Sequence, residues 1–269
     1  MIKRSMIQLR YICALVLLLI SMGSAKAQYT LFGESGTVYF DKTMYIKNIV
    51  RKQFIERSDN TFKTYLESML PQLPENMVLK KELKFNGSET MFVHPKQEID
   101  QRLKMIIMQL GLDMEATTYS NLKTKDYQRF NDFAGEKFII KDSIKNIKWK
   151  ITDEYREIAG YNCRRANGLT QDSVYVVAYY TVEIPVDGGP ESIHGLPGMI
   201  LGMVVPSQHV SYFATKVELT GGTELDKKAF ENPKTKRMTR NELKAMLKQN
   251  LGNFLNEDML NYILRLTLL

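Results

Sequence analysis

Two Asn-Gly dipeptides, each between two segments that are expected to be strands, constrain the fold of this chain more than any other feature; around the first, apolar and polar residues partly alternate. The dipeptides are Asn86-Gly87, between 79–85 and 90–94, and Asn167-Gly168, between 161–166 and 173–181. Alternation with a period of two gives a strand one side that faces the core. Asn-Gly supplies the positive φ values of a tight hairpin turn. The pattern therefore predicts two antiparallel hairpins.

Further strands are expected where β-branched and aromatic residues gather, because these side chains suit a pleated surface. The segments are 36–40, 137–140, 147–152, 200–205 and 210–219. No internal repeat and no Pro- or Ser-rich linker divides the chain. We therefore expect an α+β fold that is mostly antiparallel β, with one curved-sheet domain over 28–269 and flanking helices.

Helical spacing of apolar residues predicts three helical regions. The first covers 47–70 with an interruption near 58–60, and the second covers 98–110 and stops at Gly111. The third begins after Thr239, because Thr239 and Glu242 form a capping box. Residues 239–269 are accordingly expected to form a helical tail.

Residues 1–27 have the three parts of a secretory signal: basic residues, an apolar run over 11–20, and a small-x-small site at 25–27. The apolar run is too short for a permanent anchor, since a spanning helix needs about 20 apolar residues. We expect export, a mature chain that begins at Gln28 without a transmembrane span, and a location in the periplasm, at the outer membrane or outside the cell.

Charge and cysteine content exclude two classes of protein. Removing residues 1–27 takes away four basic residues and no acidic residue, which lowers the formal charge from +7 to +3. A charge this small does not indicate a nucleic-acid partner. Cys163 is then the single cysteine, so no intramolecular disulfide framework exists, and we interpret Cys163 as a small buried hydrophobic residue.

From residue 148 onward the sequence carries a recognisable order of short motifs. They are Trp149-Lys150-Ile151, Ile158-Ala159-Gly160-Tyr161, Tyr179-Tyr180-Thr181, Gly189-Pro190 and His194-Gly195-Leu196-Pro197-Gly198-Met199-Ile200. In this order and spacing the chain resembles the GLPGLI family of secreted bacterial proteins over about 117–219. Met199 departs from the second leucine of the family motif, and Tyr179 stands where tryptophan is expected. The resemblance implies export by a diderm bacterium and a mostly β domain, and it implies no particular biochemical activity.

The segment His194, Gly195, Leu196, Pro197 and Gly198 is the candidate binding site. Proline followed by glycine at the centre of a turn predicts a type II turn, with Gly198 at positive φ. One interpretation makes this segment a rigid corner that leads into a core strand. The other makes it the floor of a binding cleft.

No catalytic site, metal site or cofactor is predicted. Asp187, Ser192 and His194 could supply the residue types of a hydrolase triad, but no nucleophile-elbow motif accompanies them. The three histidines lack metal-ligand spacing, and Gly221-Gly222 lacks the Lys-Ser/Thr of a phosphate loop. The basic stretch 227–240 is interpreted as a solvated linker or as a weak contact for an acidic surface.

Three functions remain open from the sequence. The first is a non-enzymatic envelope module that binds a periplasmic or outer-membrane protein or an apolar ligand. The second is an enzyme that acts on envelope or peptide substrates and uses His194. The third is a carrier of a lipid or another apolar molecule.

Overall fold

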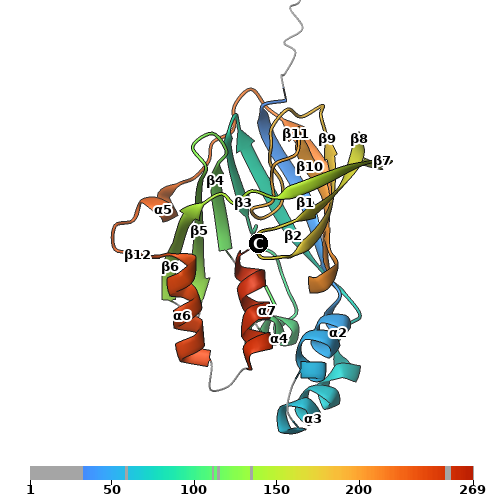
Figure 1. The fold of residues 1–269 in the computed structure, drawn as a ribbon, viewed down its shortest axis with the longest axis vertical. Helices are drawn as coiled ribbons and strands as arrows, with labels where there is room; N and C mark the ends of the chain where they lie inside the picture. Colours follow the sequence, from blue (N-terminus) through green and yellow to red (C-terminus); the bar gives the residue numbers. More distant parts are fainter. Residues whose placement is uncertain are drawn as a thin grey trace, which may run out of the picture. The chain divides into compact units, whose positions relative to one another are not determined.

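The computed structural model describes residues 33–57, 60–110, 112–113, 116–133, 136–251 and 256–268. Within these ranges the strands form a single sheet of 12 strands in the order β12-β6-β5-β4-β3-β2-β1-β11-β10-β9-β8-β7. Neighbouring strands pair antiparallel except β12 and β6, which pair parallel. Figure 1 shows the sheet curving, with α6 beside β6, α2 and α3 on the opposite side of the view, and α7 between them. The predicted α+β class with a predominantly antiparallel sheet is confirmed.

The strands have the following bounds: β1 Ser35–Met44, β2 Met77–Asn86, β3 Glu89–Val93, β4 Ala116–Asn121, β5 Asp126–Phe133, β6 Glu136–Ser143, β7 Lys148–Ile158, β8 Tyr161–Leu169, β9 Tyr175–Thr181, β10 Met199–Val205, β11 Val210–Leu219 and β12 Lys236–Met238. The helical elements are α2 Ile46–Ile49, η1 Val50–Phe54, η2 Ile55–Arg57, α3 Asn60–Met69, η3 Leu70–Gln72, α4 Gln101–Leu110, η4 Pro206–Gln208, α5 Lys228–Glu231, α6 Arg240–Leu251 and α7 Glu257–Leu268.

The hairpin predicted at Asn86-Gly87 is present as β2 and β3. Asn86 still pairs with Glu89, so the turn consists of Gly87 and Ser88. Gly87 favours glycine through its backbone alone, because its φ is 57°, whereas no atom lies within 4 Å of the position of a Cβ. The dipeptide thus marks the hairpin, although its asparagine belongs to the strand.

The turn predicted at Asn167-Gly168 is wrong. β8 continues through both residues to Leu169, and the chain turns at 170–174 instead. Gly168 is small for a packing reason: a Cβ there would lie 2.5 Å from Cζ3 of Trp149 on β7. The glycine therefore makes room for the indole ring and does not bend the chain.

The sequence patterns also miss β4 and β5, because their inward side chains are polar. Thr118 and Ser120 on β4, and Arg129 and Asn131 on β5, are all buried. A strand with polar residues on its core side lacks the apolar alternation by which strands are predicted. The polar side of these strands belongs to a cluster of buried charged residues, to which Arg129 contributes a guanidinium.

The helices agree more closely with their sequence patterns. The capping box at the start of α6 is confirmed, since the Glu242 N–H donates to Thr239 Oγ1 over 3.2 Å and the Thr239 N–H donates to Glu242 Oε2 over 2.6 Å. The predicted tail contains α6 and α7, and α7 packs on η1 through an edge-to-face contact of Tyr262 with Phe54.

The described residues contain no helix that is both long and apolar enough to cross a bilayer. Residues 1–27 lie outside the described ranges, so the signal remains a prediction.

Candidate functional site

The Gly-Leu-Pro-Gly segment is a tighter turn than the predicted type II turn. The Gly198 N–H donates to the Leu196 carbonyl over 2.7 Å, which closes a three-residue turn around Pro197, and the Met199 N–H donates to Ile184. The positive φ predicted for Gly198 is confirmed, at 147°. A Cβ on Gly198 would lie 2.0 Å from the Thr181 carbonyl oxygen. The corner therefore holds the start of β10 directly against the end of β9.

His194 lies inside this corner and does not project into an open cleft. It is 5% exposed, and its Nδ1 lies 3.0 Å from the Ser192 carbonyl oxygen. Burial lowers the pKa of His194. Its own carbonyl accepts the indole N–H of Trp149 over 2.9 Å, and the Gly195 N–H donates to Asp187. Asp187 thus holds the backbone of the corner.

The structure places the five candidate residues in two environments. His194, Leu196 and Gly198 are buried, while Gly195 and Pro197 are exposed. A role of this segment in ligand binding stays a prediction. Two residues just before it, Ser192 and Ile193, line a cavity that sequence reasoning did not identify.

Two lysines from neighbouring strands share one buried carboxylate. Lys42 of β1 and Lys81 of β2 both donate to Asp113, with 2.8 Å between Lys81 Nζ and Asp113 Oδ2. Burial lowers the pKa of Lys81 to about 8, and it lowers the pKa of neighbouring His94 to about 3 with help from the Lys81 charge. Burial alone would raise the pKa of Asp113, but the two lysines lower it below its usual value.

Glu191 connects these buried charges to the corner. Its carboxylate accepts from Arg129 Nη1 on β5 and from the Tyr212 hydroxyl on β11, both at 3.0 Å. Burial opposes ionisation of Glu191, but Arg129 and Lys42 together lower its pKa to about 2. Glu191 therefore stays charged and fixes the position of Ser192 and Ile193, the next two residues along the chain.

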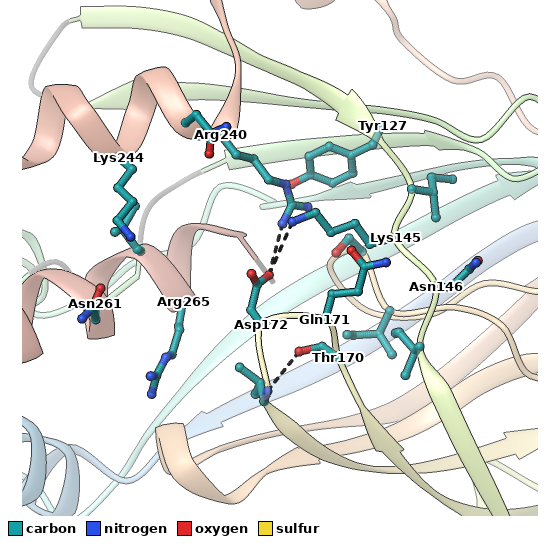
Figure 2. A pocket seen from close by; sticks show the side chains of 17 residues that line it. Tyr127, Lys145, Asn146, Thr170, Gln171, Asp172, Arg240, Lys244, Asn261 and Arg265 are labelled. Atoms are coloured by element: carbon teal, nitrogen blue, oxygen red, sulfur yellow. Dashed lines mark hydrogen bonds and ion pairs between the residues drawn. The ribbon is translucent and has the colours of Figure 1, made fainter.

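The cavity beside Ser192 and Ile193 has a volume of about 300 Å³ (Figure 2). Its floor is apolar and is formed by the mostly buried side chains of Tyr127, Ile144, Val174, Ile193 and Leu264. A cavity that combines an apolar floor with a few polar groups is the usual form of a small-molecule site.

The charged residues around this floor are mainly basic. Lys145, Arg240, Lys244 and Arg265 line the cavity with one carboxylate, Asp172. Figure 2 shows Lys244 and Arg265 on the helical side and Lys145 near Arg240. Among the described residues, Lys244 and Arg265 contact no carboxylate. The cavity therefore carries an excess of positive charge, which favours an anionic ligand.

Arg240 is the most enclosed of these cations. Its side chain is 10% exposed, and its guanidinium lies 5.2 Å from the centre of the Tyr127 ring. Arg240 Nη1 lies 3.7 Å from Asp172 Oδ2, beyond hydrogen-bond distance, and Nε lies 3.0 Å from Asp142 Oδ2 without forming a hydrogen bond. Nε is fully buried, but the Nη groups form no hydrogen bond with a described residue and thus retain donor capacity for a ligand.

The loop that carries Asp172 is held firmly. The Thr170 N–H donates to the Val174 carbonyl over 3.0 Å, and the Val174 N–H donates to Thr170 Oγ1 over 3.1 Å. These bonds close the turn between β8 and β9, so Gln171 and Asp172 project from a fixed loop at the cavity.

Sequence reasoning missed this site because its residues come from six separate segments of the chain. The sequence pattern led us to interpret Arg240 as part of the solvated basic stretch 227–240. This interpretation is wrong for Arg240, which is buried in the structure. The signal that was available is the position of Arg240 directly after the cap residue Thr239, which places it in the first turn of α6. In the part of the chain that the structure describes, no group of three His, Cys, Asp or Glu side chains could hold a metal ion.

Comparison with known proteins gives a family match over a short segment. Two solved structures of PNGF-II, in space groups C2 and P21, are similar at a TM-score of 0.49, with 14% and 17% sequence identity. The match covers 79% of this chain but only 32% and 33% of those chains, so this chain spans about a third of their length. No curated protein matches. Residues 167–202, which include the corner, match the family described as "Protein of unknown function (Porph_ging)", and this match confirms the resemblance to the GLPGLI proteins.

Proposed function

We propose that this protein is an exported, non-enzymatic binding module of the bacterial cell envelope, and that its cavity holds the anionic end of an amphiphilic ligand. The observation that carries the proposal is the cavity itself, in which four cationic side chains and one carboxylate surround an apolar floor. The signal-like residues 1–27 support export, and the resemblance to the secreted GLPGLI proteins implies an envelope role.

The charges of the cavity favour an anion for a physical reason. A guanidinium that is nine-tenths buried has lost much of its hydration, so a ligand carboxylate that pairs with it gains more than it would at an exposed site. A hydrogen bond to a charged group contributes about 1.5–3 kcal/mol, which corresponds to roughly a 10- to 150-fold change in affinity.

Calorimetric titration of the purified protein with hexanoate, with hexanol as the uncharged analogue, tests this proposal. We expect saturable binding of hexanoate, weaker binding of hexanol, and weaker hexanoate binding as the salt concentration rises. In Arg240→Gln the affinity for hexanoate should fall by roughly 10- to 150-fold.

Two further variants make the result interpretable. Lys244→Gln removes an exposed cavity charge without disturbing buried contacts, and it should weaken hexanoate binding by up to about fivefold. Lys216→Gln makes the same charge change on β11, where Lys216 pairs with exposed Glu218, and should leave binding unchanged. Equal affinity of the wild-type protein for hexanoate and hexanol, or no binding of either, would overturn the proposal.

A further inference from the structure

We infer that the ligand is the C-terminal end of a peptide chain whose last residue is apolar. This inference rests on the proposed function and identifies the chemical class of the ligand. A chain end presents three features together: a carboxylate, an apolar side chain close to it, and backbone N–H and C=O groups. The cavity has a separate set of residues for each feature.

The size of the apolar floor matches a side chain better than a lipid tail. Ile144, Val174, Ile193 and Leu264 form a floor within a cavity of about 300 Å³. Ligand sites range from about 300 to 1,000 Å³, so this cavity is at the lower end of the range. It has room for a residue or two, whereas a long acyl chain would extend beyond it into solvent.

Four carboxamide side chains surround the floor: Asn146, Gln171, Asn241 and Asn261. Their amide groups form no hydrogen bond with other residues in the described part of the chain. Each carboxamide carries both donors and an acceptor, so it can pair with the N–H and C=O groups of a peptide backbone. An acyl chain offers no such groups. The carboxamides therefore favour a peptide over a fatty acid.

The carboxylate has a defined position beside Arg240. Asp172 lies 3.7 Å from Arg240 and 3.8 Å from Lys145, close enough to hold both cations in place but too far for a hydrogen bond. A terminal carboxylate can therefore form the short charge-assisted bonds that Asp172 does not form. Recognition of a free C-terminus by fixed donors is a known mode of peptide binding.

Calorimetry with three probes tests this inference: acetyl-Ala-Ala-Ala-Leu with a free carboxylate, the same peptide with a C-terminal amide, and hexanoate. We expect the free-acid peptide to bind at least tenfold more tightly than either of the other two. In Arg240→Gln the preference for the acid over the amide should disappear.

A variant of the carboxamides separates a peptide site from a general anion site. The double substitution Gln171→Ala and Asn261→Ala should weaken binding of the free-acid peptide by about tenfold or more, since two hydrogen bonds are lost, and should leave hexanoate binding unchanged. Circular dichroism melts of the double variant would verify that it is folded.

The outcomes distinguish this inference from the proposed function. If hexanoate binds as tightly as the free-acid peptide, and the double variant weakens neither, the cavity is a site for small amphiphilic acids and the inference is overturned while the proposed function stands. If the amide binds as well as the acid, the inference is also overturned. If neither the peptides nor hexanoate bind, both fail.

Discussion

Substitution of Gly198 by alanine should destabilise the protein more than the same substitution of Gly87 or Gly221. Gly198 has a φ of 147°, and a Cβ at this position would lie 2.0 Å from the Thr181 carbonyl oxygen and 2.8 Å from the carbonyl carbon. Both atoms belong to the backbone of β9, which is paired with β10, so neither can move away as a flexible side chain could.

The magnitude follows from two separate costs. A non-glycine residue in a sparsely populated backbone region costs on the order of 1–3 kcal/mol. Relief of the contact with Thr181 requires a backbone shift, and overpacking of this kind costs a further 1–3 kcal/mol or so. We expect a total loss of about 3–5 kcal/mol, which for a chain of this size corresponds to a decrease in melting temperature of roughly 6–20 °C.

The other two glycines provide matched controls for thermal and urea unfolding. Gly87→Ala tests the backbone cost alone, because Gly87 has a φ of 57° but open space around it, and it should cost about 1 kcal/mol. Gly221→Ala has neither problem and should stay within about 0.5 kcal/mol of the wild type. A Gly198→Ala protein that unfolds like Gly221→Ala would refute the rigid-corner explanation.

Further predictions concern the buried residues around the cavity. His194→Ala should cost about 1–3 kcal/mol in urea unfolding, less than Gly198→Ala, because it removes a buried ring and leaves the Ser192 carbonyl without that partner; an unchanged midpoint would contradict this. Arg129→Met should cost about 3–5 kcal/mol, because Glu191 would keep a buried charge without its guanidinium, and a loss below 1 kcal/mol would count against the ion pair. The stability due to ionised Glu191, whose pKa of about 2 lies below the ordinary 4.5, should be complete above pH 4.5 and should be lost as the pH falls toward 2, as measured by urea unfolding across that range. Cys163 is fully buried and burial raises its pKa to about 12, so a thiol reagent should modify it only on unfolding; rapid labelling of the native protein would show that it is accessible.

The sequence predicts those parts of the fold in which the residue that suits the local backbone conformation also suits the packing of the core. β2 alternates between buried and more exposed residues up to the turn at Gly87, and the Thr239–Glu242 capping box depends on residues close in the chain. Gly168 shows the limit of local reasoning. An Asn-Gly pair indicates a turn, but here its glycine accommodates Trp149 from a neighbouring strand, and one sequence does not reveal that contact.

The site was less predictable than the fold, for a related reason. Buried Arg129 is stable because Glu191, distant in the sequence, accepts from its guanidinium, and buried Thr118 in turn accepts from Arg129. Their strands therefore lack the pattern of a strand. The cavity likewise combines Lys145 and Asp172 with Arg240 through folding alone, although the nearby corner at His194–Gly198 is recognisable from its motif.

The side-chain NMR signal of Arg240 provides the most direct measurement of the central claim, that the cavity binds an anion. The Nε–H resonance can be assigned by its absence from the Arg240→Gln spectrum and then followed during titration with hexanoate. We expect a saturable shift of this resonance that hexanol does not produce, since the guanidinium is the most enclosed cation of the cavity. Saturable binding of hexanoate with no change at Arg240 would show that the anion binds elsewhere and would contradict the assignment of the cavity.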